Sequence, residues 1–201
     1  MPRLLILGMA RSGTLYTTKV LRALGKDVIH ETHPGSDGLV SWHPVFDGHP
    51  PPRPDLITEV KHKDFDVLLH QVRHPLKTIG SSMALAQQSR SHAERVLGIR
   101  WGKNDIRGAT ECWIKWNREA ERVAQFTYKV EDMAEVLPKI LSAVGWDTVE
   151  ALGRVGGALN TVSTKTHHWS RSKVVSIEHI PEEFREDLQQ MALHYGYGRL
   201  L

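Results

Sequence analysis

The segment Leu4–Leu15, with the sequence LLILGMARSGTL, decides the fold of this chain. A run of four apolar residues leads into Gly8, and four further residues separate Gly8 from Gly13. From Thr14 to Leu24 the apolar residues recur at helical spacing, and Gly25 stands where a helix C-terminus favours glycine. The segment therefore predicts a strand, a glycine loop and a helix in succession.

The glycine loop has the spacing of a phosphate-binding loop. Glycines allow close approach of the backbone to a ligand, and the free amides at the start of the following helix attract phosphate or sulfate. An ordinary tight turn between a strand and a helix has the same spacing and is the alternative interpretation.

The loop departs from the pattern of nucleotide hydrolases. Thr14 and Leu15 stand where that pattern has lysine and then serine or threonine, and the later apolar segment VLLHQV ends without a metal-binding aspartate. The positive charge lies inside the loop instead, at Arg11. The loop is therefore poorly equipped for ATP chemistry, whereas Arg11 is suited to neutralising the charge of a phosphosulfate.

Working outward from the loop, strand and helix patterns alternate along the chain. The expected strands are 28–29, 56–60, 67–72 and 126–130; the expected helices are 75–88, 109–124, 131–144 and 181–195; 30–54, 89–108 and 153–166 are expected to be loops. This alternation predicts an α/β fold with three layers, helix, sheet and helix, around a mainly parallel sheet. We expect a single domain over residues 1–201.

The composition narrows the class of protein. The chain has 201 residues, 40% of them hydrophobic and 24% charged, with a formal net charge of +3 and one cysteine. It contains no apolar stretch long enough to span a membrane and no run of five basic residues, so we expect neither a membrane span nor a nucleic-acid partner. A single cysteine favours a reducing compartment, and the predicted location is the cytoplasm.

Two motifs in this chain resemble the sulfotransferase superfamily, whose sulfuryl donor is 3′-phosphoadenosine 5′-phosphosulfate (PAPS). Arg11-Ser12-Gly13-Thr14 matches the family's first loop, [KR]-S-G-T, in the arginine form found in the Golgi carbohydrate, tyrosylprotein and bacterial branches. VRHPLKTIGSS is similar to the family's 3′-phosphate motif, in which an arginine after a strand and a serine eight residues later bind the phosphate. Those residues are Arg73 and Ser81 here.

The resemblance implies a cofactor site made of several parts. The 5′-phosphosulfate would be bound by loop residues Arg11, Ser12, Gly13, Thr14 and Leu15, and the 3′-phosphate by Arg73 and Ser81. The segment from Tyr128 to Leu141 is similar to the family's R-Y-E-D-L stretch, although Val130 replaces its tyrosine, and the family's late R-K-G-x-x-G loop is absent. The basic segment STKTHHWSRSK, with Lys165, Trp169 and Arg171, is either a substitute for that loop or a solvated basic loop.

Sulfuryl transfer also needs a base for the acceptor's proton and a cation for the leaving oxygen. Arg11 suits the second role. Relatives carry a glutamate or histidine base after the second strand, which implies Glu31, with His33 as the rival and a surface carboxylate as the alternative. We expect no metal site, because the histidines of residues 30–54 match no compact ligand spacing.

The sequence thus predicts a PAPS-dependent sulfotransferase that acts by metal-independent in-line displacement and releases 3′-phosphoadenosine 5′-phosphate (PAP). Its acceptor would be a hydroxyl or amine of a small molecule or glycan. The alternatives are a P-loop nucleotide or nucleoside kinase, and a non-catalytic module that binds adenosine phosphates. No motif specifies the acceptor's identity or the oligomeric state.

Overall fold

The protein is built on a five-stranded sheet whose neighbouring strands all run parallel, in the order β2-β3-β1-β4-β5. The computed structural model describes residues 2–55, 57–163 and 173–200. Within these the strands are β1 (Leu4–Gly8), β2 (Val28–His30), β3 (Gly38–Ser41), β4 (Val67–Val72) and β5 (Phe126–Lys129). The predicted parallel α/β architecture is confirmed.

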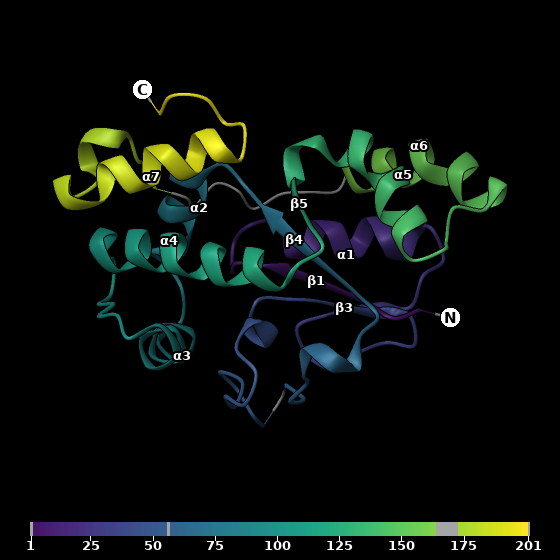
Figure 1. The fold of residues 1–201 in the computed structure, drawn as a ribbon, viewed down its shortest axis with the longest axis horizontal. Helices are drawn as coiled ribbons and strands as arrows, with labels where there is room; N and C mark the ends of the chain where they lie inside the picture. Colours follow the sequence, from purple (N-terminus) through teal and green to yellow (C-terminus); the bar gives the residue numbers. More distant parts are fainter. Residues whose placement is uncertain (1, 56, 164–172, 201) are drawn as a thin grey trace.

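Helices cover both faces of the sheet (Figure 1). They are α1 (Thr14–Ala23), α2 (Pro75–Ser82), α3 (Gln87–Leu97), α4 (Ile106–Val123), α5 (Met133–Ala143), α6 (Val149–Ser163) and α7 (Glu182–His194). One layer contains α1, α5 and α6; the other contains α2, α4 and α7, with α3 packed on α4. This is the three-layer arrangement that the alternating pattern predicts.

The central strand β1 joins two hydrophobic cores. Successive side chains of a strand point to opposite faces. Leu4 and Ile6 accordingly pack with α1, α5 and α6, whereas Leu5 and Leu7 pack with α2, α4 and α7. All four side chains are fully buried, so β1 and the loop that follows it rest on a rigid support.

The expected loop over 30–54 contains a strand of the sheet, and this part of the prediction is wrong. β3 lies between β2 and β1, and its four residues are all buried. Its sequence, GLVS, is short, opens with glycine and is surrounded by prolines and histidines, so local pattern gives little sign of it. The expected strand at 56–60 is also wrong, because residues 57–60 form no strand.

Two helices differ from their predictions. The helix expected over 75–88 ends at Ser82. Residues 89–97 of the expected basic loop at 89–108 belong to α3, in which only His92 and Ala93 are fully buried. The expected loop at 153–166 belongs to α6 as far as Ser163. Three glycines make the sequence of α6 look like a loop, but contacts with α1 and α5 favour the helix.

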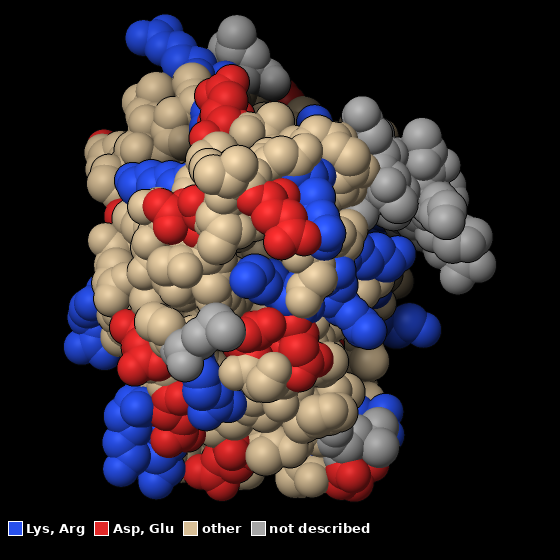
Figure 2. Space-filling view, turned by 90° about the vertical axis from the view of Figure 1, so that its right-hand side faces the viewer, with Lys and Arg blue, Asp and Glu red and all other residues tan. Residues whose placement is uncertain are grey.

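The surface carries both signs of charge. On the face shown in Figure 2, lysine and arginine side chains lie among aspartates and glutamates. Among the described residues, no helix is both long and apolar enough to cross a bilayer.

Candidate functional site

The carboxyl ends of β1 and β4 form the centre of the candidate site. After β1 the chain proceeds through α1 to β2 on one side of the sheet, whereas after β4 it proceeds to β5 on the other side. Parallel sheets bind ligands in the crevice outside the strand ends where such connections diverge. The glycine loop and Arg73 follow these two strands and meet at that point.

The glycine loop adopts a tight turn that ends on α1. The Ser12 N–H donates to the Met9 carbonyl oxygen across 2.9 Å, and Gly13 caps the helix in the left-handed region at φ 94°. Arg11 also has a positive φ, 76°, which is uncommon for a residue with a side chain. Such strain concentrates at functional sites, where the surrounding structure holds it in place.

The loop packs so closely on Gly8 that this position admits no side chain. A Cβ on Gly8 would lie 2.7 Å from Cγ2 of Thr14 and 2.8 Å from Oγ of Ser12. The Ser12 Oγ is buried and has no hydrogen-bond partner among the described residues. An unpaired buried hydroxyl beside the amides at a helix start fits a phosphate or phosphosulfate oxygen, which would accept its hydrogen bond. Of the other loop residues, Thr14 is buried and Leu15 is half exposed.

Arg73 joins the two strand ends. Its Nη1 donates to the carbonyl oxygen of Arg11 across 2.9 Å, and its side chain is buried. Burial lowers the pKa of Arg73 to about 10, and the nearby Glu131 opposes that shift, so the guanidinium keeps its charge at neutral pH. A buried cation at the floor of the crevice favours an anionic ligand.

Ser81 lies in the last turn of α2 and is half-buried. Its neighbour Gly80 packs directly against the backbone of residues 173–175, because a Cβ there would lie 2.2 Å from the carbonyl oxygen of Lys173. The chain therefore returns beside Ser81 immediately after the basic segment, and the exposed Lys173 lies near it. Lys165, Trp169 and Arg171 lie outside the described residues.

Glu31 follows β2 and lies near the glycine loop. Burial raises the pKa of its carboxyl group, and the positive charge of Arg11 opposes that increase. Its Oε1 is 3.7 Å from Nε2 of His30, which itself lies 2.9 Å from the hydroxyl of Thr14. Glu31 has a positive φ of 62°, so Arg11 and Glu31 are two of three such non-glycine residues in the described chain.

His33 lies apart from this group. It is exposed, and its Nδ1 is 3.3 Å from the hydroxyl of Thr32. The pKa of Asp27 is lowered mainly by hydrogen bonds from Ser36, and His33 adds a smaller electrostatic contribution. His33 therefore lies toward Asp27, which precedes β2, rather than beside the loop.

Two histidines near these strand ends, His30 and His43, were not predicted as site residues. Burial lowers the pKa of each to about 4, so both are neutral at pH 7. His30 contacts the loop through Thr14, whereas His43 Nδ1 lies 2.7 Å from Oγ of Ser41 at the end of β3. The HETH sequence after a strand was a usable signal for His30. The position of His43 near a strand end can be recognised only once β3 is known.

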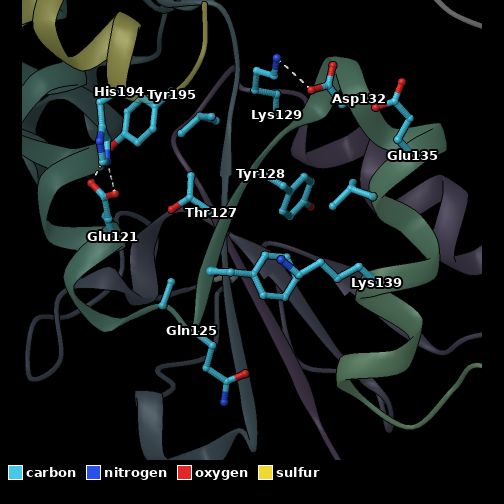
Figure 3. A pocket seen from close by; sticks show the side chains of 14 residues that line it. Glu121, Gln125, Thr127, Tyr128, Lys129, Asp132, Glu135, Lys139, His194 and Tyr195 are labelled. Atoms are coloured by element: carbon cyan, nitrogen blue, oxygen red, sulfur yellow. Dashed lines mark hydrogen bonds and ion pairs between the residues drawn. The ribbon is translucent and has the colours of Figure 1, made fainter.

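A separate groove of about 660 Å³ runs along the edge strand β5 (Figure 3). Its charged side chains are largely paired, Lys129 with Asp132 and Glu121 with His194. No residue of the glycine loop lines it. In the described residues, no three histidine, cysteine, aspartate or glutamate side chains gather as a metal site would require.

Comparison with known proteins supports the fold. The chain is similar to the crystal structure of a mouse sulfotransferase in complex with PAP, with a TM-score of 0.51 and 11% sequence identity. The similarity covers 96% of this chain and 83% of the mouse chain. No family model matches the sequence, and no curated protein matches it. The likeness therefore establishes a sulfotransferase-like fold.

Proposed function

We propose that the protein is a PAPS-dependent sulfotransferase. One observation carries the proposal: a glycine loop without the lysine of nucleotide hydrolases lies against a buried arginine at the end of the adjacent strand. The two are joined by the hydrogen bond from the Arg73 guanidinium to the Arg11 carbonyl oxygen. The same loop carries a second cation, Arg11, and the unpaired buried hydroxyl of Ser12. The sulfotransferase-like fold supports the same function.

In this proposal the loop amides, Ser12 and Thr14 hold the 5′-phosphosulfate, and Arg73 and Ser81 hold the 3′-phosphate. When bound, PAPS supplies the sulfuryl group, which leaves the 5′-phosphate oxygen for an acceptor oxygen or nitrogen. Arg11 offsets the negative charge on that leaving oxygen.

Glu31 is the proposed base. Its carboxylate accepts the acceptor's proton as the new bond forms, and its raised pKa makes it a stronger base than an exposed glutamate. His33, the rival, is exposed and lies toward Asp27. The acceptor is proposed to be a hydroxyl or amine of a small molecule or glycan.

Calorimetric titration with PAP, with ATP and AMP as comparison ligands, tests the proposal. We expect micromolar, magnesium-independent PAP binding that requires the 3′-phosphate. Arg11→Ala and Arg73→Ala should each weaken it about tenfold or more, as expected for the loss of a charge-assisted contact. Arg122→Ala, at an exposed arginine near the end of α4, is the matched control and should bind normally.

Other outcomes would identify other functions. Magnesium-dependent preference for ATP would favour a P-loop kinase. Tight PAP binding without sulfuryl transfer to any of a broad panel of acceptors would favour a non-catalytic binding module. Unchanged PAP affinity in both arginine variants would overturn the proposed site.

A further inference from the structure

A buried amide lies directly beneath the glycine loop. Gln71 in β4 is fully buried, and its Nε2 donates to the carbonyl oxygen of Ser12 across 2.9 Å. Its Oε1 accepts from the hydroxyls of Thr17 in α1 and Tyr128 in β5, the latter across 2.9 Å. Because a carbonyl oxygen can only accept, the contact with Ser12 fixes which end of the amide faces the loop.

This contact determines the orientation of a loop peptide group. In a trans peptide the N–H points opposite to the C=O, and the described chain has no cis peptide. With the Ser12 carbonyl held toward β4, the N–H of Gly13 therefore points away from β4. Within the part of the chain that the structure describes, that N–H has no hydrogen-bond partner.

Arg73 holds the preceding Arg11 carbonyl in the same way, through Nη1. Two consecutive carbonyl oxygens are thus turned toward β4 and away from the side on which the phosphate is proposed to bind. A carbonyl turned the other way, toward that phosphate, would present its negative end to the ligand and remove an amide donor. Arg73 is also a proposed ligand of the 3′-phosphate, whereas Gln71 is fully buried and is not a proposed ligand.

We infer that Gln71 is a positioning residue that orients the Ser12–Gly13 peptide for the 5′-phosphate end of the cofactor. The inference rests on the proposed function and adds to it a residue that the family motifs do not contain. Gln71 acts from the α1 side of the sheet, where Thr17 and Tyr128 secure its Oε1. A hydrophobic residue at this position would leave the Ser12 carbonyl unpaired and the loop free to turn.

The test compares two ligands, PAP and adenosine 3′-phosphate, which lacks the 5′-phosphate. Gln71→Glu preserves shape and both Oε1 contacts but places a carboxylate oxygen against the Ser12 carbonyl. Gln71→Met removes the polar contacts without adding charge. For each variant we expect the affinity ratio of PAP to adenosine 3′-phosphate to fall about tenfold or more, with adenosine 3′-phosphate itself bound within about twofold of normal.

Thr17→Val is the milder variant, because it removes one donor to Oε1 and leaves the amide in place. We expect a smaller fall in the same ratio, which keeps the test decisive should either Gln71 variant fail to fold. Asn117→Asp is the matched control: Asn117 is also a buried amide, and its Nδ2 donates to the Trp113 carbonyl oxygen across 2.7 Å, on the α4 side. That variant should lose stability and keep the ratio.

The outcomes separate this inference from the proposed function. If the unsubstituted chain binds PAP far better than adenosine 3′-phosphate and the Gln71 and Thr17 variants retain that ratio, the role of Gln71 is overturned and the function stands. An equal loss of both ligands in these variants, or a loss of the ratio in Asn117→Asp as well, would show a purely structural role. Failure of the unsubstituted chain to bind PAP would overturn both.

Discussion

At the scale of single residues, a substitution of Glu31 should lower the rate of sulfuryl transfer and leave cofactor binding nearly unchanged. Glu31→Gln keeps the size of the side chain but removes the proton acceptor, so we expect the transfer rate to fall about 10²–10⁴-fold. PAP affinity should stay within a few-fold, because the proposed phosphate contacts come from other residues. Parallel measurement of initial rates and calorimetric PAP binding checks both expectations. A transfer rate lost in His33→Gln and kept in Glu31→Gln would reverse the assignment.

The pKa of Glu31 also predicts a pH dependence. Burial raises that pKa above its ordinary value, and a base acts only when ionised. The transfer rate should therefore increase with pH through the raised pKa and be lost below it. Arg11 opposes the increase, so a residual rate measured in Arg11→Ala should show the same limb displaced to higher pH. A limb that moves to lower pH would contradict the electrostatic contact between these residues.

The turn of the glycine loop was predictable because its geometry is local. The spacing of Gly8 and Gly13 predicts a tight connection between a strand and a helix, and the structure has one between β1 and α1. The binding of an anion by this loop stays a prediction. Gln71 was not predictable in this way. Its role depends on Ser12, Thr17 and Tyr128, which come from three other parts of the chain. Two polar residues, His70 and Gln71, at the end of an apolar central strand were the available signal, because buried polar groups need partners.

At the scale of elements, the contact between α2 and residues 173–175 is a close backbone approach. A Cβ on Gly80 would lie 2.2 Å from the carbonyl oxygen of Lys173 and 3.2 Å from Cγ2 of Val175. Gly80→Ala must therefore push this segment away from α2, and we expect a loss of about 1–3 kcal/mol in the free energy of unfolding. Urea denaturation measures it, and unchanged stability would contradict the packing described here.

Gly153→Ala is the matched control on another helix. A Cβ at Gly153, inside α6, would meet nothing within 4 Å. Because alanine favours helix over glycine, this variant should gain about 0.5–1 kcal/mol in the free energy of unfolding. The same substitution should thus change the free energy of unfolding in opposite directions in the two helices. That difference distinguishes the effect of tertiary contact from the effect of helix propensity.

The elements that sequence predicted well are those whose patterns are long or bounded by clear signals. β4 has a short apolar run, α4 has helical apolar periodicity, and α7 begins with acidic residues. β3 was missed because four residues give no period, and its place between β2 and β1 is set by pairing with strands distant in sequence. α6 was missed because its glycines weaken the local signal while packing against α1 supplies the stability.

At the scale of the whole molecule, four buried or half-buried histidines make the fold sensitive to acid. Burial lowers the pKa of His30, His43, His70 and His92 to about 4. Between that value and the ordinary value of 6.5, the unfolded chain binds more protons than the folded one. The free energy of unfolding is therefore highest above pH 6.5 and decreases as the pH falls toward 4.

His70 is the sharpest test of this acid sensitivity, because it is fully buried between Thr127 and Asn117, with contacts of 3.0 Å to each. A pKa lowered from 6.5 to about 4 corresponds to at most about 3 kcal/mol between the ends of that range. His70→Gln cannot take up this proton, so its unfolding free energy should depend less steeply on pH when measured by urea denaturation at about pH 7.5, about pH 6 and about pH 5. His33→Gln, at an exposed position, should keep the full dependence. Equal slopes in both variants would show that His70 is protonated in the folded protein, and that the hydrogen bond from His70 to the Asn117 side-chain oxygen outweighs burial in setting its pKa.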